Sequence, residues 1–487
     1  MTTLIPLWKD FSYFEHQEVG IRWMLTKEKA GTEVSTRDGK GTVTVRGGFQ
    51  CDDMGLGKTI QIASTMVNHV KKSTLLIAPL AMIETWASVC QRAGMIVYEV
   101  VKGQWTKRSS EITSLPKHFM KCRPTVYISN YEKLYHTFKL FDRAWDRVVL
   151  DEAHKIRNGD GQVAVYARKI NAPIRWVVTG TPLVNSLRDV VSLLAFIGVP
   201  YSPIWFWEEK RYSVILPQLL LHRTLHSLRA VIKGAPPVPE IHEDVLPFTT
   251  EEEGEFYHGV QGASESMIKK YSGDLVSQVE IFKLLLRLRQ ISVHPQIYID
   301  AKRREDHLYN RKNWNAPSTK LTRIQSIMKE DTKETHKYII FCQFIDEMSL
   351  IREFLLSQSL AKDENILLYH GGMNQAERTK VLEHSKQTTE TTVMLLQLQA
   401  GGVGLNLQEY DRIIFVSPWW TSALMDQAIA RAVRMGQTKV VKVYHLRLQS
   451  EESDSIINID SMVNGKAAEK RKMLENLFKR CEQEQEQ

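Results

Sequence analysis

Short apolar runs of strand length alternate with longer helix-like stretches along most of this chain. In the first half the apolar runs occupy residues 74–78, 125–129, 147–150 and 175–178, and in the second half residues 338–342, 366–369, 392–396, 412–416 and 440–446. Continuous apolar strands that alternate with helices are typical of parallel sheets covered by helices on both faces. The pattern therefore predicts an α/β protein with two doubly wound parallel sheets.

The region between the two sets of strands has a different character. It begins with a Gly-Ala-Pro-Pro-Val-Pro segment at residues 234–239, which interrupts regular structure. A helix-like stretch at 278–291 follows, and a polar, basic stretch at 301–318 resembles a linker. We expect a first lobe (1–235), a helical insertion and linker (236–316), a second lobe (317–460) and a C-terminal charged helix (461–487).

Composition narrows the class of protein without identifying it. A chain of 487 residues with 43% hydrophobic and 25% charged positions is typical of a globular protein of two or three domains. No apolar run approaches about 18 residues and no signal peptide is recognisable, so neither a membrane span nor secretion is expected. The five cysteines form no Cys-x-x-Cys pair, which argues against structural zinc. The net charge of +8 is compatible with a polyanionic partner.

The clearest chemical signature is the segment Asp53-Met54-Gly55-Leu56-Gly57-Lys58-Thr59. Its glycines allow the backbone to wrap a polyphosphate, and a helix that begins near Thr59 would add its positive N-terminal dipole. We expect Lys58 to reach the β- and γ-phosphates of ATP and the Thr59 hydroxyl to bind Mg²⁺. The usual loop has an earlier glycine where this chain has Asp52, so a glycine-rich turn before a surface helix is the alternative.

A second candidate follows the apolar run at 147–150, which leads into Asp151-Glu152-Ala153-His154. Open α/β sheets bind ligands at the carboxyl ends of their strands. Asp151 is expected to hold Mg²⁺, and Glu152 to orient and deprotonate the attacking water. A solvated acidic loop is the alternative, but the phosphate-loop sequence upstream favours a nucleotide site.

A third candidate lies in the second half, at residues 426–437. If this segment is helical, Gln427, Arg431 and Arg434 share one face. Two converging arginines suit the charge that develops on a γ-phosphate during its transfer. A solvated basic helix face is the alternative.

Taken in order, these segments resemble the motifs of the Swi/Snf-related family of DNA-dependent ATPases, within superfamily 2 of the helicase-like proteins. The resemblance extends from about Phe14 to about Leu446. The matching segments are 16–24, 53–61, 77–80, 129–132, 151–154, 179–183 with Asn185, 286–295, 340–344, 370–372, 399–407 and 417–420. Val184 and the pair Thr421-Ser422 depart from the family's common residues. None of these positions is a proposed catalytic group, so the departures affect only the expected coupling between ATP hydrolysis and DNA movement.

The resemblance implies two RecA-like lobes, with Gln17 on the adenine side of the nucleotide and Arg431 and Arg434 as catalytic arginines. It also implies DNA contacts, which would come from Pro79, Ser129, Asn130, Gln343, Gly401, Gly402, Trp419 and Trp420. For the two tryptophans, burial in the core or at a lobe interface is the competing interpretation. Little of the chain lies outside the motor, which is typical of a compact member such as a viral one.

The function implied is an ATP- and Mg²⁺-dependent enzyme that translocates on double-stranded DNA and remodels protein–DNA complexes. The alternatives are a strand-separating helicase and an ATP-gated DNA clamp that recruits transcription or repair factors. The expected protein partners are nucleosomes or the transcription or repair machinery, and the sequence does not distinguish between them. The expected location is the nucleus or a viral replication site.

Overall fold

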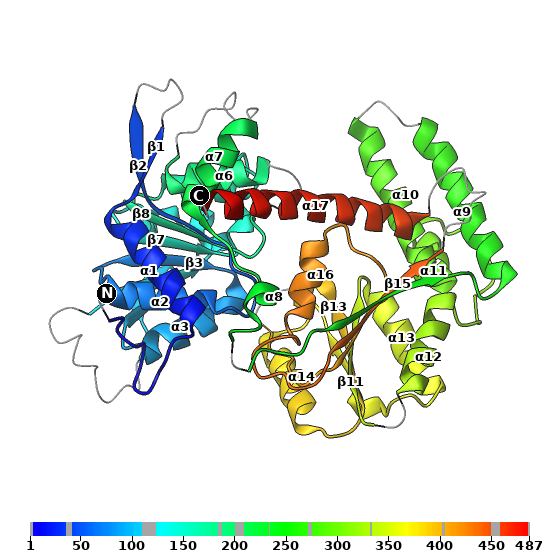
Figure 1. The fold of residues 1–487 in the computed structure, drawn as a ribbon. Helices are drawn as coiled ribbons and strands as arrows, with labels where there is room; N and C mark the ends of the chain where they lie inside the picture. The colour runs from blue at the N-terminus through cyan, green and yellow to red at the C-terminus, as the bar shows by residue number, and fades with distance from the viewer. Residues whose placement is uncertain are drawn as a thin grey trace. The chain divides into compact units, whose positions relative to one another are not determined.

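The computed structural model describes residues 3–35, 41–109, 123–183, 188–199, 209–232, 234–270, 275–331, 334–401, 405–449 and 458–485. The chain forms two compact units. The first consists of Met1–Gly234 together with Lys470–Gln487, and the second of Ala235–Glu469. Each unit is built around its own sheet, with helices packed against it (Figure 1).

The first unit contains a nine-stranded sheet in the order β1-β2-β8-β7-β3-β6-β4-β5, with β9 paired to β2. The outer strands β1 and β5 pair antiparallel with β2 and β4, and the other pairs are parallel. The strands are β1 (Thr32–Ser35), β2 (Thr42–Gln50), β3 (Thr74–Ala78), β4 (Ile96–Val101), β5 (Gln104–Lys107), β6 (Thr125–Asn130), β7 (Arg147–Asp151), β8 (Ile174–Val178) and β9 (Leu220–Leu221).

Helices cover both faces of this sheet because the side chains of its central strands alternate between two buried clusters. In β3, Leu75 and Ile77 join the cluster beneath α5 and α6, whereas Leu76 and Ala78 join the one beneath α2 and α3. The helices are α1 (Glu15–Lys29), α2 (Lys58–Asn68), α3 (Ile83–Arg92), α4 (Tyr131–His136), α5 (Gln162–Lys169), α6 (Arg188–Ile197), α7 (Glu209–Leu219) and α8 (Leu225–Leu228).

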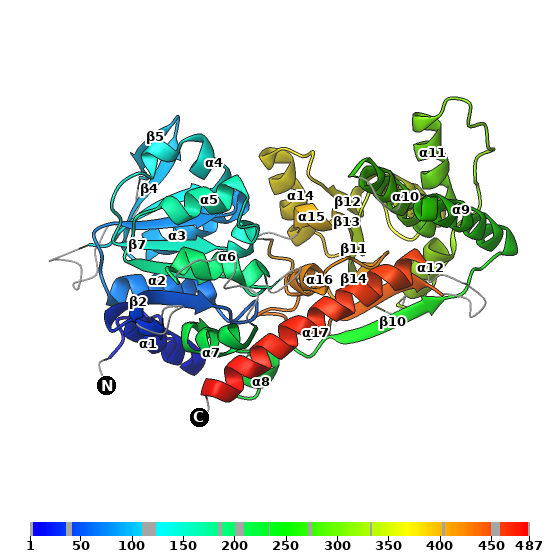
Figure 2. The ribbon, with the colours of Figure 1, turned by 90° about the horizontal axis from the view of Figure 1, so that it is seen from above.

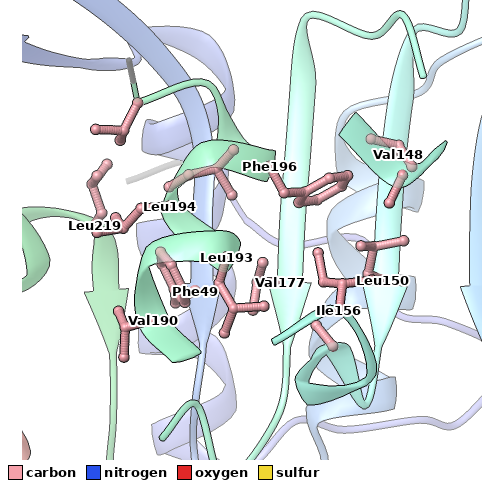
Figure 3. Packing of buried hydrophobic residues seen from close by; sticks show 14 of the residues in the cluster. Phe49, Val148, Leu150, Ile156, Val177, Val190, Leu193, Leu194, Phe196 and Leu219 are labelled. Carbon is pink, nitrogen blue, oxygen red and sulfur yellow. The ribbon is translucent and has the colours of Figure 1, made fainter. Parts of the chain in front are cut away.

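Figure 3 shows the α6 side of this core. Val190, Leu193 and Phe196 of α6 point toward side chains of β2, β8 and β7, among them Phe49 and Val177. Fully burying a side chain of this size stabilises the fold by about 1.5–3 kcal/mol. The packing fixes the three strands whose carboxyl ends carry the candidate nucleotide site.

The second unit contains a six-stranded sheet in the order β10-β15-β14-β11-β13-β12, and all of its pairs are parallel. Its strands are β10 (Glu240–Leu246), β11 (Lys337–Cys342), β12 (Ile366–Tyr369), β13 (Thr392–Gln397), β14 (Arg412–Phe415) and β15 (Lys442–Leu448). Its helices are α9 (Glu251–Lys270), α10 (Leu275–Val293), α11 (Pro295–Glu305), α12 (Thr319–Glu330), α13 (Ile345–Ser357), α14 (Gln375–Gln387), α15 (Leu398–Gly401) and α16 (Ser422–Ile429). Helices α9 and α10 lie side by side in both views (Figures 1 and 2).

The last helix, α17 (Ile459–Gln485), begins with residues of the second unit, and from Lys470 onward its residues belong to the first. Ile459 and Val463 are buried in a cluster of the second unit. Leu477 and Phe478 are buried in the first unit's core. Each end of the helix therefore has an apolar anchor of its own.

The predicted α/β class with two mostly parallel sheets is confirmed. The stretch at 301–318, expected to be a linker, is helical at its start because α11 continues to Glu305. That helix is held by Pro295 at its first turn and by the buried side chains of Ile299 and Ala301. In the described part of the chain, no helix combines the length and apolar character needed to cross a bilayer.

Candidate nucleotide site

Three neighbouring strands of the first sheet end in the segments that the sequence singled out. Strand β8 lies between β2 and β7, and its last residue, Val178, is in register with Gln50 on one side and Asp151 on the other. The phosphate loop follows β2, the Thr-Gly-Thr segment that begins at Thr179 follows β8, and Glu152 follows β7. Parallel strands thus bring segments that are far apart in sequence to one edge of the sheet.

The phosphate loop occupies residues 51–57, between β2 and α2. Gly55 and Gly57 have φ angles of 89° and 80°, in the left-handed region that glycine adopts without strain. A Cβ atom on Gly57 would also lie 2.5 Å from Nε2 of Gln17, so a larger residue there would displace the Gln17 amide. The loop leads directly into the N-terminus of α2, which is the geometry of a phosphate cradle.

Lys58, the first residue of α2, has its ammonium group at this loop. Its Nζ donates hydrogen bonds to the carbonyl oxygens of Asp52 at 2.6 Å and Asp53 at 3.2 Å. A Cβ atom on Gly180 would lie 3.6 Å from the same Nζ. The lysine is therefore held at the loop and close to the segment that follows β8.

Helix α1 contributes the residue expected on the adenine side. Nε2 of Gln17 donates to the carbonyl oxygen of Leu56 at 3.4 Å, and a ring nitrogen of His16 lies 3.1 Å from the same oxygen. Both side chains are buried. The structure thus brings Gln17 to the phosphate loop, although 39 positions separate it from Leu56 in sequence.

Asp151, at the end of β7, is a buried carboxylate with few opposing charges. Burial and the neighbouring charge of Glu152 raise the pKa of Asp151 to about 6, despite a hydrogen bond from Trp86 and the attraction of Lys58. Nε1 of Trp86 donates to its Oδ2 at 2.7 Å, and the Tyr131 hydroxyl donates to its carbonyl oxygen at 2.6 Å. A divalent cation would stabilise the charged form of such a group, so Asp151 fits a magnesium ligand.

Glu152 has a left-handed backbone, with φ and ψ both 48°. Residues other than glycine rarely adopt this conformation, and where they do they often lie at functional sites. Its Oε2 lies 3.3 Å from Nδ1 of His154, and that nitrogen lies 3.5 Å from the Thr179 hydroxyl. His154 therefore connects the Asp-Glu pair with the segment that follows β8.

Sequence reasoning missed two residues of this site, Trp86 and Arg223. Trp86 lies on α3 and is fully buried, and the indole N–H, the one polar group of its side chain, donates a hydrogen bond to the Asp151 carboxylate. Arg223 follows β9 and forms an ion pair with Asp52. A buried tryptophan needs a partner for its N–H group, but nothing in the sequence indicates which one.

The two arginines of the second unit do not lie on a helix, which corrects the prediction for residues 426–437. Helix α16 ends at Ile429, and the following residues form turns. The carbonyl oxygen of Arg431 accepts a hydrogen bond from the Leu407 N–H at 3.1 Å, so it is not part of a continuing helical ladder. Both arginines are partly buried, and burial lowers the pKa of Arg434.

In the first unit, the residues expected to face DNA lie together at the ends of two paired strands. Pro79 directly follows β3, and Ser129 and Asn130 end β6, where they are in register with Ile77 and Ala78 of β3. Within the described residues, the Ser129 Oγ and Asn130 Oδ1 atoms are buried without a hydrogen-bond partner. Leaving such an atom unsatisfied costs about 1–3 kcal/mol, which favours a ligand at this edge.

In the second unit, the corresponding residues follow three adjacent strands. Gln343 follows β11, Gly401 ends α15 just after β13, and Trp419 and Trp420 follow β14. Gly402 lies outside the described residues, as does Asn185.

The two tryptophans are partly buried. Trp419 packs against the cluster beneath α14 and α16, and Trp420 against the cluster beneath α9 and α10. The guanidinium of Arg289 lies 4.9 Å and 5.8 Å from their ring centroids. These contacts favour a packing role for at least part of each ring.

Among the residues that the structure describes, no group of three or more His, Cys, Asp or Glu side chains is arranged to hold a metal ion by itself, whereas Mg²⁺ in a nucleotide site needs only one or two carboxylates beside the phosphates.

Comparison with known proteins identifies two matching families. Residues 16–297 match the SNF2-related domain and residues 319–436 match the helicase conserved C-terminal domain. The chain is 26% identical over 458 residues to a probable global transactivator of Orgyia pseudotsugata multicapsid polyhedrosis virus. This alignment covers 90% of this chain and 87% of the relative. The chain is also 24% identical over 436 residues to the ISWI chromatin-remodeling complex ATPase ISW2 of Saccharomyces cerevisiae. That alignment covers 84% of this chain but only 38% of the relative.

Among solved structures, the Sulfolobus solfataricus SWI2/SNF2 ATPase core in complex with dsDNA aligns over 98% of both chains. The sequence identity is 21% and the TM-score is 0.41.

Proposed function

The chain belongs to the SNF2-related family and is an ATP-hydrolysing, helicase-like enzyme, and from that premise we propose that it translocates on double-stranded DNA and remodels protein–DNA complexes. The observation that carries the proposal is the convergence of the phosphate loop, Thr179 and the Asp151–Glu152 pair at adjacent strand ends. A loop with the sequence and backbone of a phosphate cradle beside the buried Asp151 and the half-buried Glu152 supports hydrolysis of a nucleoside triphosphate.

Each group at this edge has a proposed part in hydrolysis. Lys58 and the backbone N–H groups of the loop would bind the β- and γ-phosphates, and Gln17 would contact the adenine. Asp151 and the Thr59 hydroxyl would hold Mg²⁺, which when bound neutralises phosphate charge. Glu152 would orient the attacking water and accept its proton.

For Arg431 and Arg434 the proposed role is to stabilise the charge that develops on the transferred phosphoryl group. Both guanidinium groups belong to a turn that is fixed by its backbone bond to Leu407. An arginine in such a role increases turnover by about 10³ to 10⁵. Because Arg434 is partly desolvated, its charge would act more strongly on a nearby phosphate than an exposed charge could.

Duplex DNA is the proposed track. Support comes from the buried, unsatisfied Ser129 and Asn130 oxygens at one sheet edge and from the net charge of +8. Hydroxyl, amide and backbone groups mostly contact phosphates and sugars, so binding should be salt-dependent and nearly independent of sequence. The nucleus or a viral replication site is the proposed location, in line with the viral and chromatin-associated relatives.

The test is to measure ATP hydrolysis without nucleic acid and then with duplex DNA, single-stranded DNA or RNA. Strong stimulation by duplex DNA, together with ATP-dependent displacement of a third strand from a triplex, is the expected result. Stimulation mainly by single strands, with unwinding of a forked duplex, would support a strand-separating helicase instead. Duplex-stimulated hydrolysis without triplex displacement would indicate an ATP-gated clamp.

A further inference from the structure

The chain after β9 runs alongside the phosphate loop because a short parallel pairing fixes it there. Strand β9 pairs with the end of β2, and the backbone contacts continue beyond both strands. The Cys51 N–H donates to the Leu221 carbonyl at 2.8 Å, and the Asp53 N–H donates to the Arg223 carbonyl at 2.9 Å. These bonds place Arg223 beside the residues that enter the loop.

The side chain of Arg223 joins three separate segments of the first unit. Its Nε and Nη2 atoms donate to the two carboxylate oxygens of Asp52 at 3.0 Å and 2.5 Å. Its Nη1 atom donates to the carbonyl oxygen of His16 in α1, and its Nη2 atom also donates to Oε1 of Gln61 in α2 at 3.0 Å. Such a two-pronged pair is among the stronger and more directional contacts in proteins.

Asp52 is the residue that replaces the usual early glycine of the loop, and it is fully buried. Its Oδ2 also accepts hydrogen bonds from Gln50 at 3.1 Å and Gln61 at 3.0 Å. Its carbonyl oxygen accepts the hydrogen bond from Lys58 at 2.6 Å. A buried carboxylate with this many partners fixes the backbone that holds the phosphate-binding lysine.

Helix α1 approaches this network closely at Gly20. A Cβ atom at this position would lie 2.1 Å from Oε1 of Gln61 and 2.7 Å from Nη2 of Arg223. The absence of a side chain therefore lets α1 rest on the arginine. The same helix carries Gln17 to the carbonyl oxygen of Leu56 in the loop.

We infer that Arg223 is a positioning residue for ATP binding, an inference that rests on the proposed nucleotide site. By holding Asp52 and the His16 carbonyl together, it fixes the distance between the adenine-side helix and the phosphate loop. Gln17 and Lys58 can then engage the two ends of one nucleotide without prior rearrangement, and this preorganisation improves affinity. Arg223 acts through these partners, and its loss should affect nucleotide affinity more than the chemical step.

The test is the variant Arg223→Lys, which retains the charge but loses the fork. Its KM for ATP, and its Kd for a fluorescent ATP analogue, should rise roughly tenfold, which corresponds to the loss of one or two charged hydrogen bonds. Its kcat at saturating ATP should change less than about twofold. Asp52→Asn should likewise raise the KM for ATP while leaving kcat nearly unchanged. The double variant should show a KM no higher than that of the single variants, because both changes break the same ion pair.

A matched control is Arg147→Lys, which breaks a second buried arginine–carboxylate pair, with Glu28, at the amino end of β7. It should lower the Tm but leave the KM for ATP unchanged. Wild-type KM and Kd in Arg223→Lys, or in Asp52→Asn if the first variant does not fold, would overturn the inference. An equal rise of KM in Arg147→Lys would overturn it too, because the effect would then be general destabilisation. Lys58→Ala with wild-type hydrolysis would instead refute the proposed nucleotide site.

Discussion

Glu28 is a buried carboxylate whose contribution to stability can be worked out from its surroundings. It lies near the end of α1 and is 2% exposed. Arg147 donates to both of its oxygens, from Nε at 2.6 Å and from Nη2 at 2.5 Å. Nε1 of Trp176 donates at 2.9 Å, and Nδ1 of His69 lies 2.6 Å away. Because a carboxylate only accepts, the proton of this last bond belongs to the His69 ring.

The magnitude follows from the pKa of Glu28. Burial alone would raise it, but the charge of Arg147 and the hydrogen bonds of His69, Arg147 and Trp176 outweigh burial and lower the pKa from 4.5 to about 2. At about 1.4 kcal/mol per pKa unit, the ionised carboxylate contributes roughly 3 kcal/mol to the free energy of unfolding. Because the folded-state pKa is the lower one, this stability is present above pH 4.5 and is lost as the pH falls toward 2.

Glu28→Gln keeps the shape of the side chain but leaves the Arg147 guanidinium buried without its counter-charge. We expect the free energy of unfolding at pH 7 to fall by about 3–5 kcal/mol. Urea denaturation followed by tryptophan fluorescence measures this, and Trp176 lies at the site itself. The difference in free energy of unfolding between wild type and variant should narrow by about 1 kcal/mol between pH 7 and pH 4. Over this range Glu28 begins to be protonated in the unfolded state, which removes part of the stability that its ionised form gives the wild type.

Glu18→Gln is the matched control on the same helix. Glu18 is half-exposed and forms an ion pair with Arg22 at 3.5 Å, so its loss should cost less than about 1 kcal/mol. Equal stability of Glu28→Gln and wild type at pH 7 would refute the reasoning. So would a gap that widens on acidification, because the sign of the linkage would then be wrong.

Three further predictions concern hydrolysis. Lys58→Ala and Glu152→Gln should each abolish DNA-stimulated ATP turnover, and retained turnover in the second variant would exclude Glu152 as the base. Arg434→Ala should have the same affinity for DNA as wild type when binding is measured across a salt titration, but its kcat should fall by about 10³-fold or more. Trp86→Phe should fold normally by circular dichroism but lower kcat roughly tenfold, because Asp151 loses a hydrogen-bond donor that orients it.

The strands of both sheets could be located from sequence wherever a continuous apolar run was bounded by polar residues. The runs at 74–78 and 366–369 match β3 and β12 at both ends. The run at 440–446 does not, because the strand β15 spans Lys442–Leu448. Six strands were not anticipated, because each is short, partly exposed or interrupted by polar or glycine residues and so lacks a continuous apolar run of strand length. They are β1, β2, β4, β5, β9 and β10.

The segment at 426–437 shows why local periodicity is not sufficient. Its residues have the spacing of a helix, and the first part does form α16. Beyond Ile429, the Val433 N–H still donates to the Ile429 carbonyl as in a helix, but the carbonyl oxygen of Arg431 accepts a tertiary hydrogen bond from the Leu407 N–H. Gly436, with a φ of 99°, then turns the chain toward β15. The position of the two arginines is therefore set by a partner that lies outside the periodic segment.

Arg289 extends the same argument to the tryptophan pair. The sequence left two interpretations open for Trp419 and Trp420, contact with DNA and burial. The guanidinium of Arg289 lies over both rings and donates to the Pro418 carbonyl at 3.1 Å. Burial lowers the pKa of Arg289 to about 10, yet the group stays charged at neutral pH, so the cation–π attraction persists in a partly desolvated site. One arginine from α10 thereby fixes the loop after β14, and any part of the rings that reaches DNA would do so from a fixed position.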